Sequence, residues 1–205
     1  PIQPAATVTA DAKRPLILNT GRLRDQWHTM TRTAKSPRLT PEATEPVIDI
    51  NPADAGNCAL EEGALARIES DQGVLIARVH VTEAQSQGSL FAPIHFSDRF
   101  ASDARVGSLI VPVCDPISGQ PELKQTPVSA IPFDAAWHGF ALSREPIEII
   151  GADWWARAQA AGHQHTEFAG NDVPEDWDLW ARSILGELHG GAEWLAFGDK
   201  GLGLY

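Results

Sequence analysis

The sequence predicts a small, mainly β domain that closes as a barrel over residues 15–132, followed by a helical segment over residues 133–205. Short apolar runs separated by loops of moderate length recur through the first part, which favours a barrel over an open parallel sheet. The composition changes at Pro132, and six of the seven tryptophans lie beyond it. Residues 1–14, rich in Ala, Thr and Pro, are predicted to be a flexible connector.

The first strand is predicted at residues 16–19, an apolar run too short for a core helix and followed closely by Gly21. A second strand is predicted at residues 46–50. Asn51 directly precedes Pro52, the pattern of an N-cap followed by a proline in the first turn, so a short helix should follow.

The clearest hairpin is predicted from residues 64–69 and 74–82, because apolar residues alternate on both arms around the turn at residues 70–73. Two more short strands are predicted at residues 88–94 and 128–131.

Two helices are predicted in the C-terminal segment. The first is Ala-rich, covers residues 153–161, and should end at Gly162. The second covers residues 174–189 and carries a stripe at helical spacing, which predicts core packing rather than a cofactor role: Trp177, Trp180, Ile184 and Leu188.

A crowded cationic and aromatic stretch follows Gly21, and it organises the functional prediction. Guanidinium groups bind phosphate oxygens, hydroxyls and turn amides donate to the same oxygens, and aromatic rings lie against planar heterocycles. A solvated loop with Trp27 as a core anchor is the alternative. The stretch contains Arg22, Arg24, Trp27, His28, Thr29, Thr31 and Arg32.

The charge distribution supports a small anionic ligand. The net charge of −11 argues against nucleic acid or an anionic membrane as a partner. Residues 1–40 carry seven Lys/Arg against two Asp, a net +5, whereas residues 41–205 carry −16. This asymmetry suits a pyrophosphate better than a duplex. No apolar run is long enough to span a bilayer and no signal peptide is evident, so a cytoplasmic location is expected. Because the chain opens on Pro1 rather than Met, it is expected to be a piece of a longer protein.

No metal site is predicted in this chain. Cys58 and Cys114 lack CxxC spacing and are expected to be buried free thiols. His163 and His165 have no third ligand nearby in the sequence.

The stretch after the first predicted strand reads Thr20-Gly21-Arg22-Leu23-Arg24-Asp25-Gln26-Trp27-His28-Thr29, followed by Met30-Thr31-Arg32-Thr33. It resembles the C-terminal domain of the molybdenum bis(pterin guanine dinucleotide) oxidoreductases. Among these enzymes it is most similar to the bacterial assimilatory nitrate reductases. The resemblance implies a double-psi β-barrel of the aspartate-decarboxylase-like type. It also implies that the loop wraps the pyrophosphate and pterin of one dinucleotide. The implied cofactor-binding residues are Thr20, Gly21, Arg22, Leu23, Arg24, Asp25, Gln26, Trp27, His28, Thr29 and Thr31.

Three positions outside this loop complete the implied cofactor site. Lys124 closes a turn that starts at Asp115; it is either a surface lysine or, as the resemblance implies, a dinucleotide contact. His95 is either near the pterin or a satisfied loop histidine. Gly107 stands where the family commonly carries an asparagine, so that contact must come from the backbone, from Ser108, or be absent.

The resemblance further implies a larger enzyme that reduces nitrate to nitrite at a molybdenum held by two pterin dinucleotides. Electrons would reach the molybdenum through a 4Fe-4S cluster. The metal and cluster ligands would lie in upstream domains, with a further electron-donor domain or subunit possible. No catalytic residue is therefore assigned here, and the isolated chain is expected to be inactive. The alternatives are another enzyme of the superfamily, such as a formate dehydrogenase or periplasmic nitrate reductase, or a non-enzymatic binding module that kept the barrel.

Overall fold

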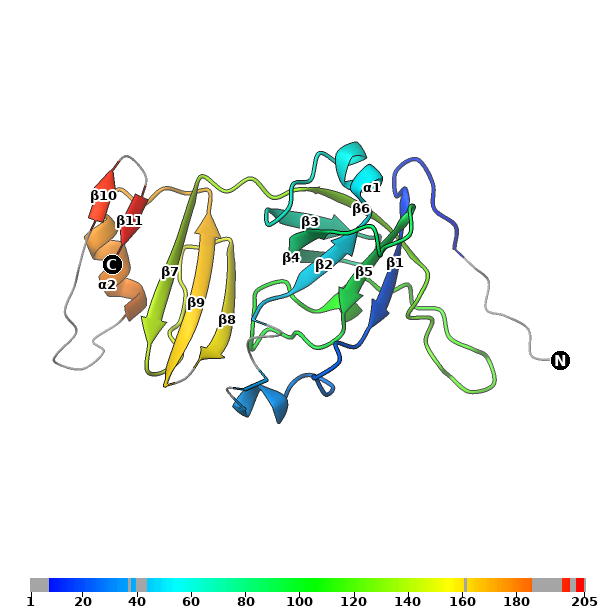
Figure 1. Ribbon diagram of the computed structural model, residues 1–205, viewed down its shortest axis with the longest axis horizontal. Coiled ribbons are helices and arrows are strands. Elements are labelled where there is room, and N and C mark those ends of the chain that lie inside the picture. Colours follow the sequence, from blue (N-terminus) through cyan, green and yellow to red (C-terminus); the bar gives the residue numbers. More distant parts are fainter. Residues whose placement is uncertain are drawn as a thin grey trace.

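The computed structural model describes residues 8–36, 38–39, 44–160, 162–185, 197–199 and 202–204. They form a closed barrel with a three-stranded antiparallel sheet beside it (Figure 1). The barrel strands are β1 (Leu16–Gly21), β2 (Val47–Ile50), β3 (Leu65–Glu69), β4 (Val74–Val81), β5 (Ser89–Pro93) and β6 (Thr126–Pro132).

The barrel closes in the order β1-β5-β2-β4-β3-β6. The β1–β5 and β2–β4 pairs are parallel, and the remaining pairs are antiparallel. Alternate residues of the strands point inward and fill the barrel with branched side chains, such as Leu18, Ile48, Ile68 and Leu90, all at 0% exposure. The predicted mainly β barrel is confirmed.

The local predictions inside the barrel also hold. β3 and β4 pair from Leu65↔Arg78 to Glu69↔Val74, and the Ser70 hydroxyl accepts hydrogen bonds from two amides of the turn. Helix α1 (Pro52–Asn57) begins after Asn51, whose side-chain oxygen accepts from the Ala53 N–H at 3.0 Å. The connections of the described part of the chain include the short 3-10 helices η1 (Thr33–Lys35) and η3 (Val106–Leu109).

The predicted helix over residues 153–161 is wrong, because this segment is strand β8 (Trp154–Ala160). It pairs with β9 (His163–Gly170), which also pairs with β7 (Trp137–Ser143). Trp154, Ala156 and Ala158 are 1%, 4% and 8% exposed, whereas the residues between them are partly exposed. This period-two burial outweighs the helix propensity of the alanines.

The second predicted helix exists as α2 (Trp177–Leu185). Its Trp177 and Trp180 rings lie 5.2 and 5.1 Å from the Trp137 ring, edge to face, so their predicted packing role is confirmed. The side chain of Ile184 and all of Leu188 lie outside the described residues. A small hairpin of β10 (Phe197–Asp199) and β11 (Leu202–Leu204) follows.

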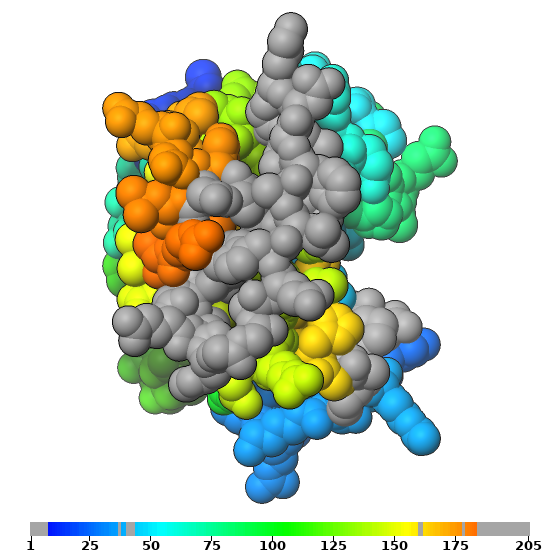
Figure 2. Space-filling model, turned by 90° about the vertical axis from the view of Figure 1, so that its left-hand side faces the viewer, coloured from blue at the N-terminus to red at the C-terminus, as the bar shows by residue number. Residues whose placement is uncertain are grey.

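The β7-β9-β8 sheet is docked on the barrel through β8. Ser102 and Trp155 exchange hydrogen bonds, with the Trp155 N–H donating to the Ser102 hydroxyl at 2.9 Å, and Ala101 bridges to Ala156. Trp154 is buried in a cluster that includes Leu65 of the barrel. Helix α2 packs on the opposite, outer side of this sheet (Figure 1), and Figure 2, viewed from that side, shows it in orange. The division into domains at residues 132 and 133 stays a prediction.

None of the helices in the described part of the chain is long and apolar enough to cross a membrane.

Candidate functional site

The cationic loop leaves the barrel where two parallel strands end side by side. Gly21, at the end of β1, pairs with Pro93, at the end of β5, and the Ile94 N–H donates to the Gly21 carbonyl at 2.9 Å. A Cβ at Gly21 would lie 2.6 Å from the Phe91 ring. A side chain at this position would therefore force the Phe91 ring on the neighbouring strand to shift, a constraint that the sequence did not reveal.

His95 fixes the first half of the loop. Its side chain is fully buried, its Nε2 accepts from the Leu23 N–H at 2.9 Å, and its Nδ1 lies 2.5 Å from the His28 carbonyl oxygen. A carbonyl can only accept, so Nδ1 carries the proton and the imidazole is neutral. Because both ring nitrogens are bonded to the loop backbone, the geometry gives His95 a positioning role.

Gln26 and Met30 fix the second half. The Gln26 amide donates to the Leu39 carbonyl at 2.9 Å, while its Oε1 is buried without a partner among the described residues. Met30 is 3% exposed and packs in the cluster beneath the β7-β9-β8 sheet. His28 and Met30 have φ of +45° and +57°, a conformation that costs energy in residues with a Cβ. These anchors hold the loop in that conformation.

The outer side of the loop presents an aromatic and a cationic group together. The Arg22 guanidinium lies 5.0 Å from the centroid of the Trp27 ring, and the His28 ring meets Trp27 edge-on at 4.4 Å. Trp27 is 52% exposed, so it is not a core anchor. An exposed indole beside a guanidinium can contact both a flat ring and its phosphates.

Lys124 reaches the same edge from a distant part of the chain. Its ammonium donates to the Thr20 carbonyl, and the Thr20 hydroxyl donates to the Leu123 carbonyl at 2.8 Å. Thr20 is two residues from Arg22. The structure therefore brings Arg22, Trp27 and Lys124 to one end of β1, from positions that the sequence separates by about a hundred residues.

The charges at this edge are unequal. Arg24 Nη2 lies 2.6 Å from Asp25 Oδ2, and the hydrogen bond from this guanidinium holds the pKa of Asp25 below its ordinary value. Arg24 and Asp25 thus offset each other. Among the described residues, Arg22 has no carboxylate within ion-pair distance, so its charge is available to an anion. The hydroxyl-bearing Thr29 and Thr31 are both exposed further along the loop.

Gly107 lies elsewhere on the barrel, in η3. The adjacent Ser108 hydroxyl donates to the carbonyls of Val74 and Arg105, which ties η3 to the start of β4. A Cβ at Gly107 would meet nothing within 4 Å. Of the hydrogen bonds that the described residues make, none joins Gly107 to the 20–33 loop. A cofactor contact at Gly107 stays a prediction.

The two cysteines differ in exposure. Cys58 is partly buried, and burial raises the pKa of its thiol. Cys114 is exposed, so the prediction of a buried thiol is wrong there, because its loop returns at the surface through a bridge to Pro121. In the described ranges, no group of three His, Cys, Asp or Glu side chains is placed to hold a metal ion.

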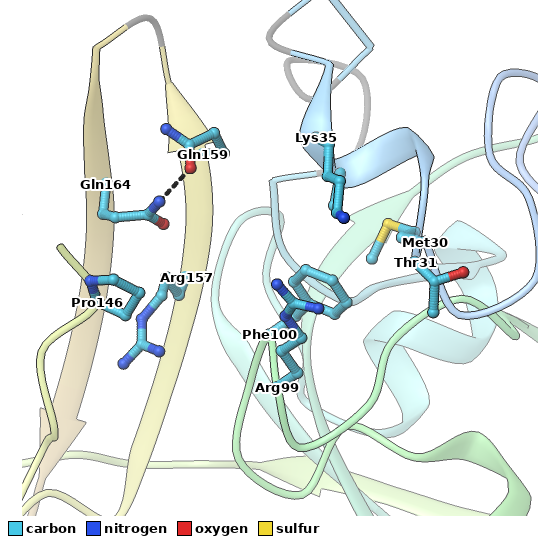
Figure 3. A pocket seen from close by; sticks show the side chains of 10 residues that line it. Met30, Thr31, Lys35, Arg99, Phe100, Pro146, Arg157, Gln159 and Gln164 are labelled. Atoms are coloured by element: carbon cyan, nitrogen blue, oxygen red, sulfur yellow. Dashed lines mark hydrogen bonds between the residues drawn. The ribbon is translucent and has the colours of Figure 1, made fainter. Parts of the chain in front are cut away.

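A second cationic feature was missed by the sequence reasoning. A cleft of about 320 Å³ lies between the loop and the β7-β9-β8 sheet, and Lys35, Arg99 and Arg157 are among its lining residues (Figure 3). Arg157 was hidden inside the wrongly predicted helix. An alternation of alanine with polar residues from Ala156 to Gln159, directly after two tryptophans, was the signal that could have revealed it.

Comparisons with known proteins identify relatives of this chain. The family described as "Molydopterin dinucleotide binding domain" matches residues 16–127. A nitrate reductase from Klebsiella oxytoca is 47% identical over 86% of this chain and 21% of its own length. The assimilatory nitrate reductase catalytic subunit of Bacillus subtilis is 33% identical over 64% of the chain and 18% of its length.

The F420-dependent formate dehydrogenase subunit alpha of Methanocaldococcus jannaschii is 36% identical, over 56% of this chain and 16% of its own length. The chain thus spans about a fifth of the length of the curated relatives it matches.

Proposed function

Because the chain belongs to the molydopterin dinucleotide binding domain family, we propose that its 20–33 loop and Lys124 hold one pterin guanine dinucleotide of a molybdenum cofactor in a nitrate-reducing enzyme. The observation that carries this proposal is the meeting of Arg22, Trp27 and Lys124 at one end of β1.

The residues present fit such a ligand. A pyrophosphate needs compensating positive charge when it is taken out of water, and Arg22 and Lys124 supply two cations at the same edge. The exposed ring of Trp27, braced by His28, suits a flat heterocycle. Thr29 and Thr31 offer hydroxyl donors. The Leu23 amide is not offered, because it already donates to His95.

The cofactor, when bound, supplies the electron transfer that converts nitrate to nitrite. The part played by this chain is to bind and orient that group, and no residue of the chain is assigned to catalysis. Electrons would arrive through a 4Fe-4S cluster and a donor held by other parts of a longer enzyme, in an assimilatory role in the cytoplasm. The sequence similarity to nitrate reductases, which extends over most of the chain in one relative, supports this assignment.

The runner-up is a formate dehydrogenase of the same superfamily, which the similarity over 56% of the chain supports. That similarity covers less of the chain than the match to the Klebsiella oxytoca nitrate reductase. A periplasmic nitrate reductase and a binding module without catalysis are the remaining alternatives.

The test uses the full-length polypeptide that contains this domain, purified with its molybdenum cofactor. Reduction of nitrate by a reduced dye and oxidation of formate by an oxidised dye are measured on the same preparation. Nitrate turnover without formate turnover is expected. Formate turnover alone would select the runner-up, and nitrate turnover by the isolated, metal-free chain would contradict the assignment of catalysis to other domains.

A further inference from the structure

The cleft between the loop and the sheet has cationic walls on both sides. Lys35 and Arg99 come from the barrel side, and Arg157 comes from β8 (Figure 3). Its remaining lining is apolar or neutral, with the side chains of Gln159 and Gln164 facing it from the sheet. No carboxylate is among the lining residues.

The positive charge of this cleft is not offset locally. In the part of the chain that the structure describes, neither Lys35 nor Arg99 lies within ion-pair distance of a carboxylate. Three like charges around one cleft repel one another, and an anion between them would convert that repulsion into attraction.

Arg157 is held in place but not saturated. Its guanidinium lies 4.9 Å from the centroid of the Trp155 ring and donates to the Ile147 carbonyl through Nη2. Its Nε is buried and has no partner among the described residues. Burial lowers the pKa of Arg157, yet a guanidinium stays charged at neutral pH. A buried donor without an acceptor costs free energy that a bound oxygen would recover.

The two walls are joined through the backbone, which fixes the segments that carry Arg99 and Arg157 relative to each other. The backbone N–H of Arg157 donates to the Phe100 carbonyl at 2.6 Å, which ties the strand that carries Arg157 to the residue next to Arg99. The side chains of Gln159 and Gln164 are hydrogen-bonded to each other. Preorganised donors bind a ligand at a lower entropic cost.

We propose that this cleft is an oxoanion-binding site, distinct from the dinucleotide site at the end of β1. Neither Arg22 nor Lys124 lines it. The inference rests on Lys35, Arg99 and Arg157 and does not depend on the proposed function. The ligand is a small oxoanion, either free or as the phosphate of a nucleotide, since both present the same oxygens to the three cations.

The test is a titration of the isotope-labelled 205-residue chain with inorganic phosphate, with nitrate and with guanosine monophosphate at constant ionic strength, chloride replacing the ligand. Arginine Nε–H resonances report binding. Saturable shifts of Arg99 and Arg157, absent for Arg67 on β3, are expected. The variants Lys35→Gln and Arg99→Gln should each weaken binding by about two- to fivefold, and Arg67→Gln should not.

The source of the oxoanion follows from the ligands compared. Saturation by phosphate or nitrate identifies a free ion, and a tighter response to guanosine monophosphate that Arg99→Gln weakens identifies a nucleotide phosphate. The Arg22→Ala variant separates the two sites, because it should leave the cleft response unchanged. Shifts that never saturate, or that persist unchanged in a Lys35→Gln/Arg99→Gln double variant with wild-type thermal stability, would overturn the proposal.

Discussion

The Lys124 ammonium donates a hydrogen bond to the carbonyl oxygen of Thr20, joining two segments that lie 104 residues apart in the chain. The contact holds one cation beside the strand end from which Arg22 emerges. It is reinforced by the Thr20 hydroxyl, which is buried and donates to Leu123. The cationic edge is thus part of the barrel's own hydrogen bonding and does not depend on a ligand to assemble it.

The loop should depend on His95 for its conformation. His95→Ala leaves the Leu23 N–H and the His28 carbonyl without their partner and should lower the free energy of unfolding by about 2–4 kcal/mol. Chemical denaturation measures this, and amide exchange at Leu23 should accelerate. The control His80→Ala removes an exposed histidine paired with Asp49 and should cost less than about 1 kcal/mol. Equal losses of unfolding free energy in the two variants would show that the two hydrogen bonds of His95 do not stabilise the loop.

Gly21 should resist even the smallest substitution. Gly21→Ala places a Cβ 2.6 Å from the Phe91 ring, and the forced shift should destabilise the barrel by about 1–3 kcal/mol. Gly56 in α1 is the matched control, because a Cβ there meets nothing within 4 Å. Gly56→Ala should be neutral or stabilising by up to about 1 kcal/mol. Thermal unfolding of both variants decides the point, and a neutral Gly21→Ala would show that Phe91 can move aside.

Glu45 should make the stability depend on pH. Burial raises the pKa of Glu45 above its ordinary value of 4.5, and this effect outweighs the lowering of the pKa by the hydrogen bond from Arg78. The Oε2 atom of Glu45 is buried without a partner among the described residues. The folded chain therefore binds this proton more tightly than the unfolded chain, and the group's contribution to stability is lost as pH rises through the folded pKa.

Glu45→Gln removes this ionisation, while Arg78 keeps its ion pair with Glu167 at 2.8 Å. The stability of the variant relative to wild type should rise from pH 4.5 upward and level off above the folded pKa. Urea unfolding between about pH 4 and 8 measures the difference. A difference that falls over this range would mean that the Arg78 pairing dominates.

Two tryptophans should separate folding from binding. Trp154 is 1% exposed, so Trp154→Ala should cost about 3–5 kcal/mol. Trp27 is 52% exposed, so Trp27→Ala should cost about 1 kcal/mol or less and should reduce cofactor retention in the full-length enzyme. Calorimetry gives the first quantity and molybdenum content the second. Full retention by Trp27→Ala would remove Trp27 from the site.

The barrel could be predicted from the sequence because its signals are local. The hairpin of β3 and β4 is indicated by two segments with alternating apolar residues and by the four-residue turn between them. Helix α1 is indicated by the Asn-Pro pair at its start. The β7-β9-β8 sheet could not be predicted in the same way. Its β8 is rich in alanine, and only its pairing with β9 and its burial against the barrel make it a strand.

The candidate site was predictable only in part. The cluster after Gly21 is contiguous, so Arg22 and Trp27 could be placed together, and the family resemblance added Lys124. The two hydrogen bonds of the His95 ring could not be predicted, since they are made to backbone groups that lie 72 and 67 residues away in the chain. The cleft of Lys35, Arg99 and Arg157 joins three separate segments, and no motif marks it.

The most direct measurement is the molybdenum and guanine nucleotide content of the full-length enzyme after Arg22→Ala and Lys124→Ala, compared with Arg67→Ala. Arg67 is a barrel arginine paired with Glu69, away from the cationic edge. We predict that the first two variants lose most of their cofactor while their isolated domains melt within a few degrees of wild type, and that Arg67→Ala keeps its cofactor. Full occupancy in both Arg22→Ala and Lys124→Ala would contradict the account.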